Sequence, residues 1–421
     1  MRIDVLFCFF LLIAALPVAA QADETRYELN GHTKIRLLGD AFPGNSIFRD
    51  VAGATALDSE GDLRLNFSAT KDRWSFNAAY QLFALYGDSI EYTRDLSTSV
   101  GLPFERLPGD DRRLFDLTDT LSDSGELASL HRLDRLWIGY SSENTILRVG
   151  RQALSWGNGL FFSPMDIVNA FDPATIDPEY KSGDDMLYAQ YLKQNGDDVQ
   201  AAWVVRREPT TGRVESSVST AAVKYHRIAG DNEYDLLIAR SYDSTTLGIG
   251  GNRSIGGAVW RADLVLTDAT DWTVELVTNL SYSWVWSGKN VTGALEYYFN
   301  GFGETRDSHD ILSLTQNPEL LARLARGQTF SIGRNNVAAG ITIELSRLWL
   351  FTPNVFMNLS DQSALLQFVT QHNLGDNLTF LAALNLPLGP NGTEYGGIGA
   401  GLPDRYVSQS GGLFAQLAWY F

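Results

Sequence analysis

The sequence predicts an all-β fold, a transmembrane antiparallel β-barrel of about 18 strands, from three observations. Segments in which apolar and polar residues alternate recur along the chain, the pattern of strands with one apolar and one polar face. The loops between these segments are alternately short and long, as in bacterial barrels with short periplasmic turns and longer extracellular loops. No apolar run beyond the N-terminal segment approaches the ~18 residues that a membrane-spanning helix requires.

The last segment, 411–421, carries the alternating pattern clearly. One face consists of Leu413, Ala415, Leu417, Trp419 and Phe421. In a transmembrane barrel the closing strand ends at the membrane interface, where aromatic residues gather. The edge strand of a soluble sheet is the alternative for this segment alone, but the rest of the chain favours the barrel.

Residues 1–22 have the pattern of a secretory signal peptide. Arg2 precedes an apolar run over 5–16, and Ala20-Gln21-Ala22 supplies the small residues of a cleavage site. We therefore expect one mature domain, the outer-membrane β-barrel of residues 23–421. Cys8, the only cysteine, lies in the segment expected to be removed, which excludes disulfides and cysteine metal sites from the mature chain.

The composition agrees with a barrel in the outer membrane of a Gram-negative bacterium. Mean hydropathy is only −0.11 although 12% of the residues are aromatic, as expected where half of each strand faces lipid and half faces water. The net charge of −17 argues against nucleic-acid partners. The expected partners are outer-membrane lipid, lipopolysaccharide and the barrel assembly machinery, with a periplasmic partner as a further option.

Parity supports eighteen strands, because this even number places all long loops on one side. The weakest strand is 245–251; without it the loop 301–329 would fall on the periplasmic side, and sixteen strands is the fallback. The predicted strands are 26–38, 61–70, 73–86, 131–141, 144–154, 184–193, 198–207, 217–227, 233–242, 245–251, 256–267, 273–286, 290–300, 330–344, 347–358, 362–372, 377–387 and 411–421.

Two long loops have features of their own. In one, Asn317-Pro318-Glu319 followed by an apolar run and Gly327 predicts a capped helix. The other, 155–180, is strongly apolar and would be costly on an outer surface, so we expect it to fold back into the barrel as a constriction loop. A lid packed on neighbouring loops is the alternative. Its candidate constriction residues are Trp156, Phe161, Phe162, Asp166, Asn169 and Phe171.

The strand face opposite the apolar one would line the pore. The candidate pore-lining residues are Arg36, Arg64, Arg135, Arg148, Gln152, Arg261, Asp263, Glu296 and Glu344. Arginine rings favour anions, so we predict anion preference; lumen ion pairs without effect on selectivity are the alternative. Arg135 and Arg148 are nearly equidistant from a turn near Ser142, which predicts that they lie at similar depth.

Catalysis is not predicted. Barrel hydrolases need a histidine beside an acid or a serine nucleophile, and the five histidines here are scattered without such a motif. They are His32, His131, His226, His309 and His372. We therefore expect no enzyme, no cofactor and no metal site.

Two stretches resemble a known family. Arg148-Val149-Gly150-Arg151-Gln152, then Trp156-Gly157, Pro164-Met165-Asp166 and Asn169 are similar to a stretch of the alginate-export-type outer-membrane porins and their uncharacterised relatives. Glu296-Tyr297-Tyr298-Phe299-Asn300-Gly301 looks like a second such stretch. The resemblance implies an eighteen-stranded passive channel. The best-known member carries an anionic polysaccharide.

Taken with the residue patterns, the resemblance predicts an outer-membrane channel for passive diffusion or export of small or polymeric solutes, with anion preference. The alternative is a structural barrel that encloses a periplasmic partner, such as an electron-transfer conduit across the outer membrane. The apolar loop favours an open channel with its own constriction.

Overall fold

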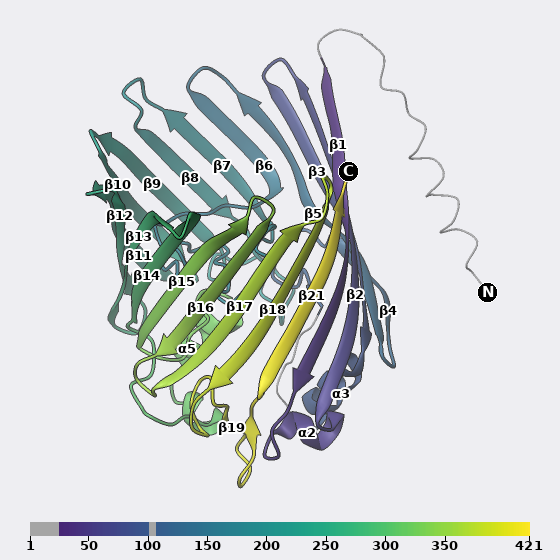
Figure 1. Cartoon of the computed structure of the whole chain (residues 1–421). Coiled ribbons are helices and arrows are strands. Elements are labelled where there is room, and N and C mark those ends of the chain that lie inside the picture. The colour runs from purple at the N-terminus through teal and green to yellow at the C-terminus, as the bar shows by residue number, and fades with distance from the viewer. Residues whose placement is uncertain (1–24, 101–106) are drawn as a thin grey trace, which may run out of the picture.

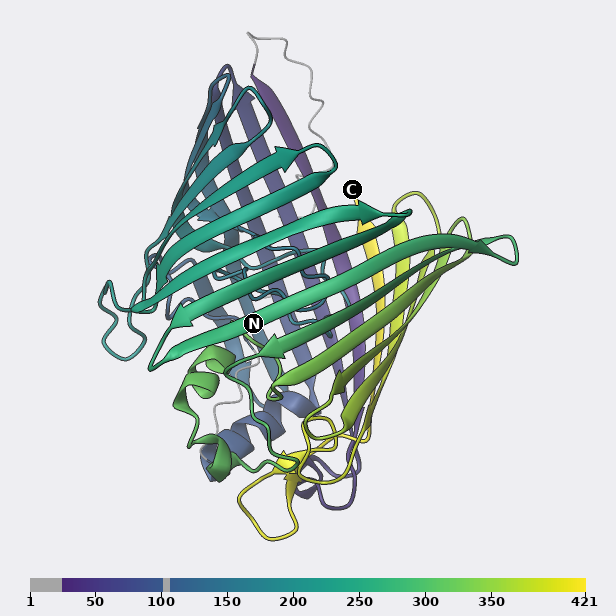
Figure 2. The same ribbon diagram turned by 90° about the vertical axis from the view of Figure 1, so that its left-hand side faces the viewer.

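The computed structural model describes residues 25–100 and 107–421, which form a closed antiparallel barrel (Figures 1 and 2). The signal peptide predicted at 1–22 lies outside the described residues. The barrel strands are β1 (Arg26–Ala41), β2 (Thr55–Lys71), β3 (Trp74–Gly87), β5 (Leu127–Ser141), β6 (Thr145–Gln152), β7 (Asp184–Leu192), β8 (Asp198–Val204), β9 (Thr220–Ala229), β10 (Asn232–Ser241), β11 (Ser244–Ile255), β12 (Ala258–Asp268), β13 (Trp272–Trp286), β14 (Lys289–Asn300), β15 (Asn335–Ser346), β16 (Trp349–Asn358), β17 (Ser363–Asn373), β18 (Leu378–Leu388) and β21 (Gly411–Tyr420).

The first and last strands close the barrel. β1 pairs with β21 from His32↔Tyr420 to Ala41↔Gly411. Beyond that ladder, the backbone N–H of Phe421 donates to the carbonyl of Gly31 at 3.0 Å. The 19-stranded sheet includes β4 (Thr118–Ser124), which pairs only with β5 and is not part of the barrel wall. Eighteen strands therefore form the barrel itself. The predicted fold class and strand number are confirmed.

The long connections gather at one end of the barrel, which we call the long-loop end (Figure 1). They contain α2 (Ile47–Ala52), α3 (Asp88–Val100), α4 (Ile311–Leu314), α5 (Pro318–Ala325) and the hairpin of β19 (Ile398–Gly399) and β20 (Tyr406–Val407). None of the helices in the described part of the chain is long and apolar enough to cross a membrane. The opposite, short-turn end is periplasmic by the usual loop asymmetry of bacterial barrels.

The outer wall of the barrel is apolar and is bordered by aromatic residues at both ends. Leu29, Ile35, Leu236, Ile249 and Leu413 are among its exposed aliphatic side chains. Exposed aromatic residues near the short-turn end are Trp74, Trp286, Trp349 and Trp419, and near the long-loop end Tyr86, Trp203 and Trp272. An apolar band between two aromatic girdles matches a lipid bilayer. The chain is therefore a barrel of the Gram-negative outer membrane.

Some strand boundaries differ from the prediction. The segment 245–251, predicted as the weakest strand, is part of the twelve-residue β11, so the sixteen-stranded fallback is wrong. The strand predicted from 330 begins only at Asn335, because the backbone N–H of Arg334 instead donates to the carbonyl of Glu304 in the preceding loop. The long connection between the strands predicted at 73–86 and 131–141 contains α3 and β4.

The helix predicted after Asn317 is present as α5. The Asn317 side chain accepts a hydrogen bond from the backbone N–H of Leu320, and Pro318 occupies the first turn. Gly327 has φ of 63°, a left-handed conformation that glycine adopts readily just after a helix. The local sequence signals therefore placed this helix correctly.

Candidate functional site

The loop between β6 and β7 runs inside the barrel. It contacts the inner wall at widely separated strands, including Gln200 of β8, Glu296 of β14, Gln367 of β17 and Lys34 of β1. The prediction of an in-folded loop is thus confirmed, and the lid alternative is wrong. From here we call residues 153–183 the lumen loop.

The first anchor of the lumen loop is polar. The indole N–H of Trp156 donates to the Gln200 side chain at 2.7 Å. The backbone N–H of Asn158 and its side-chain amide donate to the two carboxylate oxygens of Asp263 at 2.6 and 2.7 Å. Gly157, with φ of 99°, allows this close approach, since a Cβ there would lie 3.0 Å from Asp263.

The second anchor is Glu296. Its carboxylate accepts hydrogen bonds from the backbone N–H groups of Leu160, Phe161 and Phe162 at 2.6, 3.0 and 2.6 Å. The Asn279 side chain donates to it as well, at 2.9 Å. Asp263 and Glu296 therefore lie on the inner face, as predicted, but both are buried beneath the lumen loop and hold it in place.

Apolar packing seals this part of the lumen loop to the wall. The Phe162 ring stacks on Tyr298 with centroids 4.9 Å apart, and Phe161 meets Phe356 edge-on at 5.7 Å. Met165 is fully buried in a cluster with Trp156 and side chains of β7 to β12. The apolar content of the loop, which would be costly outside, is thus buried inside the barrel.

The part of the lumen loop that leads back to β7 is held by contacts between residues of the loop. The Lys181 ammonium is paired with the buried Asp166 carboxylate and donates to the carbonyl of Leu154 at 2.6 Å. The Asn169 amide donates to the carbonyl of Ser182 at 2.8 Å. Phe171 is more exposed, with its ring centroid 5.8 Å from the Lys181 nitrogen. Of the predicted constriction residues, Asp166 and Asn169 therefore shape the loop itself.

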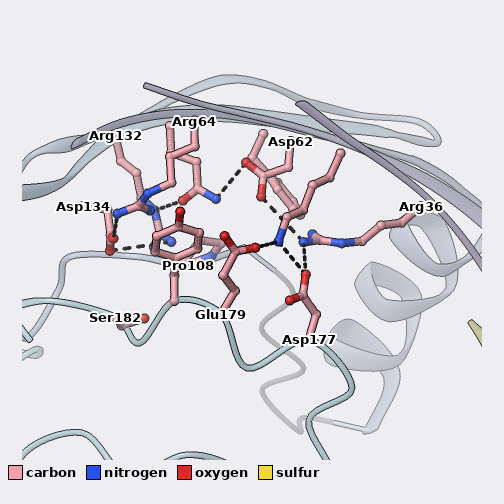
Figure 3. A pocket seen from close by; sticks show the side chains of 13 residues that line it. Arg36, Asp62, Arg64, Pro108, Arg132, Asp134, Asp177, Glu179 and Ser182 are labelled. Atoms are coloured by element: carbon pink, nitrogen blue, oxygen red, sulfur yellow. Dashed lines mark hydrogen bonds and ion pairs between the residues drawn. The ribbon is translucent and has the colours of Figure 1, made fainter. Parts of the chain in front are cut away.

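A charged cleft remains between the end of the lumen loop and strands β1, β2, β3 and β5 (Figure 3). Its volume is about 200 Å³. Basic side chains project from the strands, and loop carboxylates approach from the opposite side (Figure 3). Its charged residues are Lys34, Arg36, Arg64, Arg132, Asp62, Asp134, Asp177 and Glu179.

The loop carboxylates are paired with β1. The Lys34 ammonium lies 2.6 Å from Asp177 and 2.5 Å from Glu179. Arg36 reaches Asp177 at 3.2 Å and also pairs with Glu60 of β2. Lys34 is almost fully buried, so these pairs are far less screened than surface ion pairs.

The strand side of the cleft contains a row of guanidinium groups. Arg64 pairs with Asp134 at 2.7 Å and lies 4.1 Å from the Tyr180 ring centroid. Arg135 pairs with the same carboxylate at 2.7 Å and donates to the carbonyl of Lys181. Arg132 donates to Gln81 at 2.8 Å, and its Nη1 is buried without a hydrogen-bond partner.

A β-bulge explains why Asp134 and Arg132 were missed as lumen residues. The register between β3 and β5 shifts at Ala79/Tyr80, leaving Asp134 as the extra residue. Asp134 and Arg135 both reach the inner face, and from there towards the long-loop end the inward positions are even-numbered. Strict alternation from Leu136 would have pointed Arg132 outwards. No residue type in this stretch signals the bulge.

Arg148 does not lie at the depth of Arg135, so that prediction is wrong. The turn is centred two positions later than expected, and Arg148 is opposite Gly139. Its guanidinium lies 5.1 Å from the Trp137 ring and 5.8 Å from the Tyr188 ring, with no ion pair to a described residue. The two arginines therefore occupy separate levels of the lumen.

The remaining predicted pore residues also lie apart from the cleft. Gln152 is buried at the end of β6, where its amide contacts the carbonyl of Met186 at 3.4 Å. Arg261 of β12 donates to Ser281 at 3.0 Å. Glu344 is exposed close to a short turn and accepts from Asn290 at 2.7 Å. The structure brings only Arg36, Arg64 and Arg135 together around the cleft.

The stretch that carried the family resemblance forms the root of the lumen loop. Gly150 has φ of 122°, and a Cβ there would lie 2.2 Å from the carbonyl oxygen of Leu136. Arg151 is buried and pairs with Asp110 at 2.8 Å and Asp185 at 3.0 Å. Burial alone would raise the pKa of Asp110, but hydrogen bonds from Arg151 and Arg113 outweigh it and hold that pKa at about 2.

The two resembling stretches also meet in space, because Glu296 and Tyr298 of the second contact residues 160–162, which lie within the first. Both therefore serve to hold the loop in the lumen. Among residues 25–100 and 107–421, no group of three or more His, Cys, Asp or Glu side chains could hold a metal ion.

Known protein folds provide a comparison. The chain is similar to OccK5 (OpdH) of Pseudomonas aeruginosa, with a TM-score of 0.55 over 96% of this chain and 99% of that chain, at 8% identity. OccD3 (OpdP) of the same organism gives 0.52 over 96% and 93%, at 10% identity. A BenF-like porin from Pseudomonas fluorescens gives 0.51 over 95% and 100%, at 9% identity. These identities establish a shared barrel fold alone.

No protein-family model matches the sequence, and no curated protein matches it. The resemblance to the alginate-export-type family therefore stays a prediction.

Proposed function

We propose that the chain is an outer-membrane channel for passive diffusion of small solutes, with the charged cleft as its narrow polar passage. The observation that carries this proposal is the asymmetric placement of the lumen loop. The loop is sealed to β8–β16 by buried anchors and aromatic packing, whereas it faces β1–β5 across a cleft lined by charged side chains. A cleft lined by charged side chains suits the passage of small polar solutes.

Anion preference is the finer part of the proposal. Asp134, Asp177 and Glu179 already accept hydrogen bonds from cationic side chains of the wall. Arg132 is also paired with Asp134, at 3.9 Å, but its Nη1 keeps no hydrogen-bond partner, and the Arg148 guanidinium contacts only rings among the described residues. The free hydrogen-bonding capacity of the lumen therefore favours negatively charged groups, which arginine can bind in a bidentate manner.

The alternative of a sheath around a periplasmic partner is less compatible with this arrangement. A partner segment threaded through the barrel would have to displace the lumen loop, which hydrogen bonds tie to β1, β8, β14 and β17. Transport of an anionic polymer, as the family resemblance implies, would also require the loop to move. Small solutes require no such rearrangement.

Planar-bilayer recording of the purified barrel tests the proposal. We expect a stable ohmic conductance and, in a KCl gradient, a reversal potential of the sign for chloride preference. Arg132→Ala should move that potential towards cation preference, while Arg405→Ala, which removes an exposed arginine of the long loops paired with Asp50, should leave it unchanged. A barrel that conducts no ions would contradict the channel; cation preference of the wild type would contradict only the anion part.

A further inference from the structure

A second group of arginines lies above the lumen, at the long-loop end. α5 and the residue after it provide Arg323 and Arg326, and the loop before β4 provides Arg112. Arg323 and Arg326 line a cavity together with Thr246, Thr267 and Glu275 of strands β11 to β13. We call Arg112, Arg323 and Arg326 the arginine vestibule.

Aromatic rings hold two of these guanidinium groups in place. Arg323 lies 3.7 Å from the ring centroid of Phe302, and Arg326 lies 4.0 Å from that of Tyr242. An arginine stacked on a ring by its flat face still presents its N–H groups at the edge. The vestibule is therefore pre-organised to donate hydrogen bonds.

The vestibule cations have no direct counter-ion. Within the described ranges, none of Arg112, Arg323 and Arg326 has an ion pair or a side-chain hydrogen bond to another residue, and Nε of Arg323 is buried without a partner. The pKa of Arg326 is lowered by burial and further by the positive charges of Arg323 and Arg112, so the three groups repel one another. Such a cluster is stabilised when an anion binds between its members.

Two carboxylates lie near the cluster, but each is engaged elsewhere. Glu275 accepts a hydrogen bond from the hydroxyl of Tyr298 at 2.6 Å, and Glu319 accepts from Thr270 at 3.3 Å. Neither lies within ion-pair distance of a vestibule arginine. Three cations against two carboxylates leave an excess positive charge at the lumen entrance.

The place of the cluster indicates where its ligand comes from. The cavity beneath it is lined by inward-facing strand residues and by Ile167 of the lumen loop, so the head groups of lipids outside the barrel do not reach it. Its volume of about 20 Å³ suits a single water, so a solute would bind at the half-buried outer edges of Arg112 and Arg326.

We propose that the arginine vestibule binds the carboxylate or phosphate group of an anionic solute on its way to the charged cleft. This inference rests on the proposed channel, because it gives the vestibule the role of the first binding step on the extracellular side. A local positive potential at a pore mouth raises the concentration of anions there and hence their rate of entry.

Citrate is the probe that tests this proposal, on the full barrel in detergent by calorimetry and in a bilayer by block of the ionic current. The double variant Arg323→Gln/Arg326→Gln should weaken citrate binding by about tenfold, which corresponds to about 1.4 kcal/mol. It should also weaken block by citrate added on the long-loop side more than block from the short-turn side. Arg405→Gln, an exposed arginine at the same end, is the matched control and should bind citrate as the wild type does.

Unchanged citrate affinity in the double variant would overturn the proposal that the arginine vestibule binds anions. An equal loss in Arg405→Gln also overturns it, because general charge would then explain the binding. Arg112→Gln repeats the test on a separate loop if the α5 variant does not fold, as judged by heat-modifiable migration on a gel. Competition by purified lipopolysaccharide would assign the site to lipid phosphates and would overturn the proposal that its ligand is an anionic solute. Arginine-dependent citrate binding without conductance would contradict the channel but leave the vestibule intact.

Discussion

The two sides of the lumen loop differ in how they meet the barrel wall. Against β8–β16 the loop is fixed by backbone N–H groups on buried carboxylates and by stacked aromatic rings. Against β1 it is held by side-chain ion pairs of Lys34 and Arg36 with loop carboxylates, around a cleft. Buried backbone hydrogen bonds and close packing resist local opening, whereas partly exposed charged groups leave room for water and solute. The fixed side therefore acts as a support, and the charged side is where a passage can lie.

Removing the lumen loop should abolish the difference between its two sides and have the largest effect on conductance and ion selectivity. Deletion of 158–176, joined by a short Gly/Ser linker, removes the part that crosses the lumen but keeps the root at β6. We expect the single-channel conductance to rise severalfold and ion selectivity to fall, because the pore would approach the full barrel width. Bilayer recording measures both. Unchanged conductance would mean that the loop does not limit the current.

Breaking the fixed side alone should have the next largest effect. Glu296→Ala removes the acceptor of three loop N–H groups and leaves them buried and unpaired, which we expect to cost about 3 kcal/mol locally. Current traces should then show added open-channel noise, and amide exchange in 158–165 should accelerate. Glu344→Ala is the control, since that exposed carboxylate does not contact the loop. Loop exchange as slow as in the wild type would contradict the anchor role of Glu296.

Changing the charged side should alter selectivity more than structure. Lys34→Met leaves Asp177 and Glu179 without their main partner, which should shift the reversal potential towards cations and loosen the loop by about 2 kcal/mol. The double variant Lys34→Met/Asp177→Asn restores the charge balance and should recover part of the wild-type selectivity. If both variants have the same reversal potential, the charge at this position does not control ion flow.

The smallest effect on ion flow is expected at the long-loop end, where a buried carboxylate joins two loops. Glu394 accepts hydrogen bonds from the backbone of Ile332 and Gly333 and from Asn358. Burial, and then the nearby Asp361, raise its pKa from 4.5 to about 7. Because the folded-state pKa is raised, this contact is strongest below about pH 4.5 and weakens as pH rises through about 7, by up to about 3 kcal/mol.

Amide exchange of residues 389–411 between pH 5 and 8.5 measures that weakening after correction for intrinsic exchange. We expect protection to fall over this range in the wild type, and Glu394→Gln to remove the pH dependence. Glu319→Gln, a change of the same kind on α5, should leave the wild-type profile intact. A flat wild-type profile would contradict the titration.

The amino-acid sequence by itself determined the elements with local signals. Alternation of period two reports which face of a strand is apolar, so the number of strands and their order followed from it. The capped start at Asn317 identified α5, and the apolar content of 155–180 was enough to place that loop inside. These properties depend on neighbouring residues in the chain or on the total cost of exposing apolar surface.

Only the tertiary structure decided how the charged groups meet. The depth of Arg148 in the lumen depends on the register of the turn between β5 and β6. Because the centre of this turn lies two positions later than expected, Arg148 is opposite Gly139 and not at the level of Arg135. The inward position of Asp134 depends on a bulge that forms against β3. Lys34 and Asp177 are 143 positions apart in the chain, and nothing near either residue predicts their contact. Such pairings arise from backbone hydrogen bonding and loop closure across the whole barrel, so they are not encoded locally.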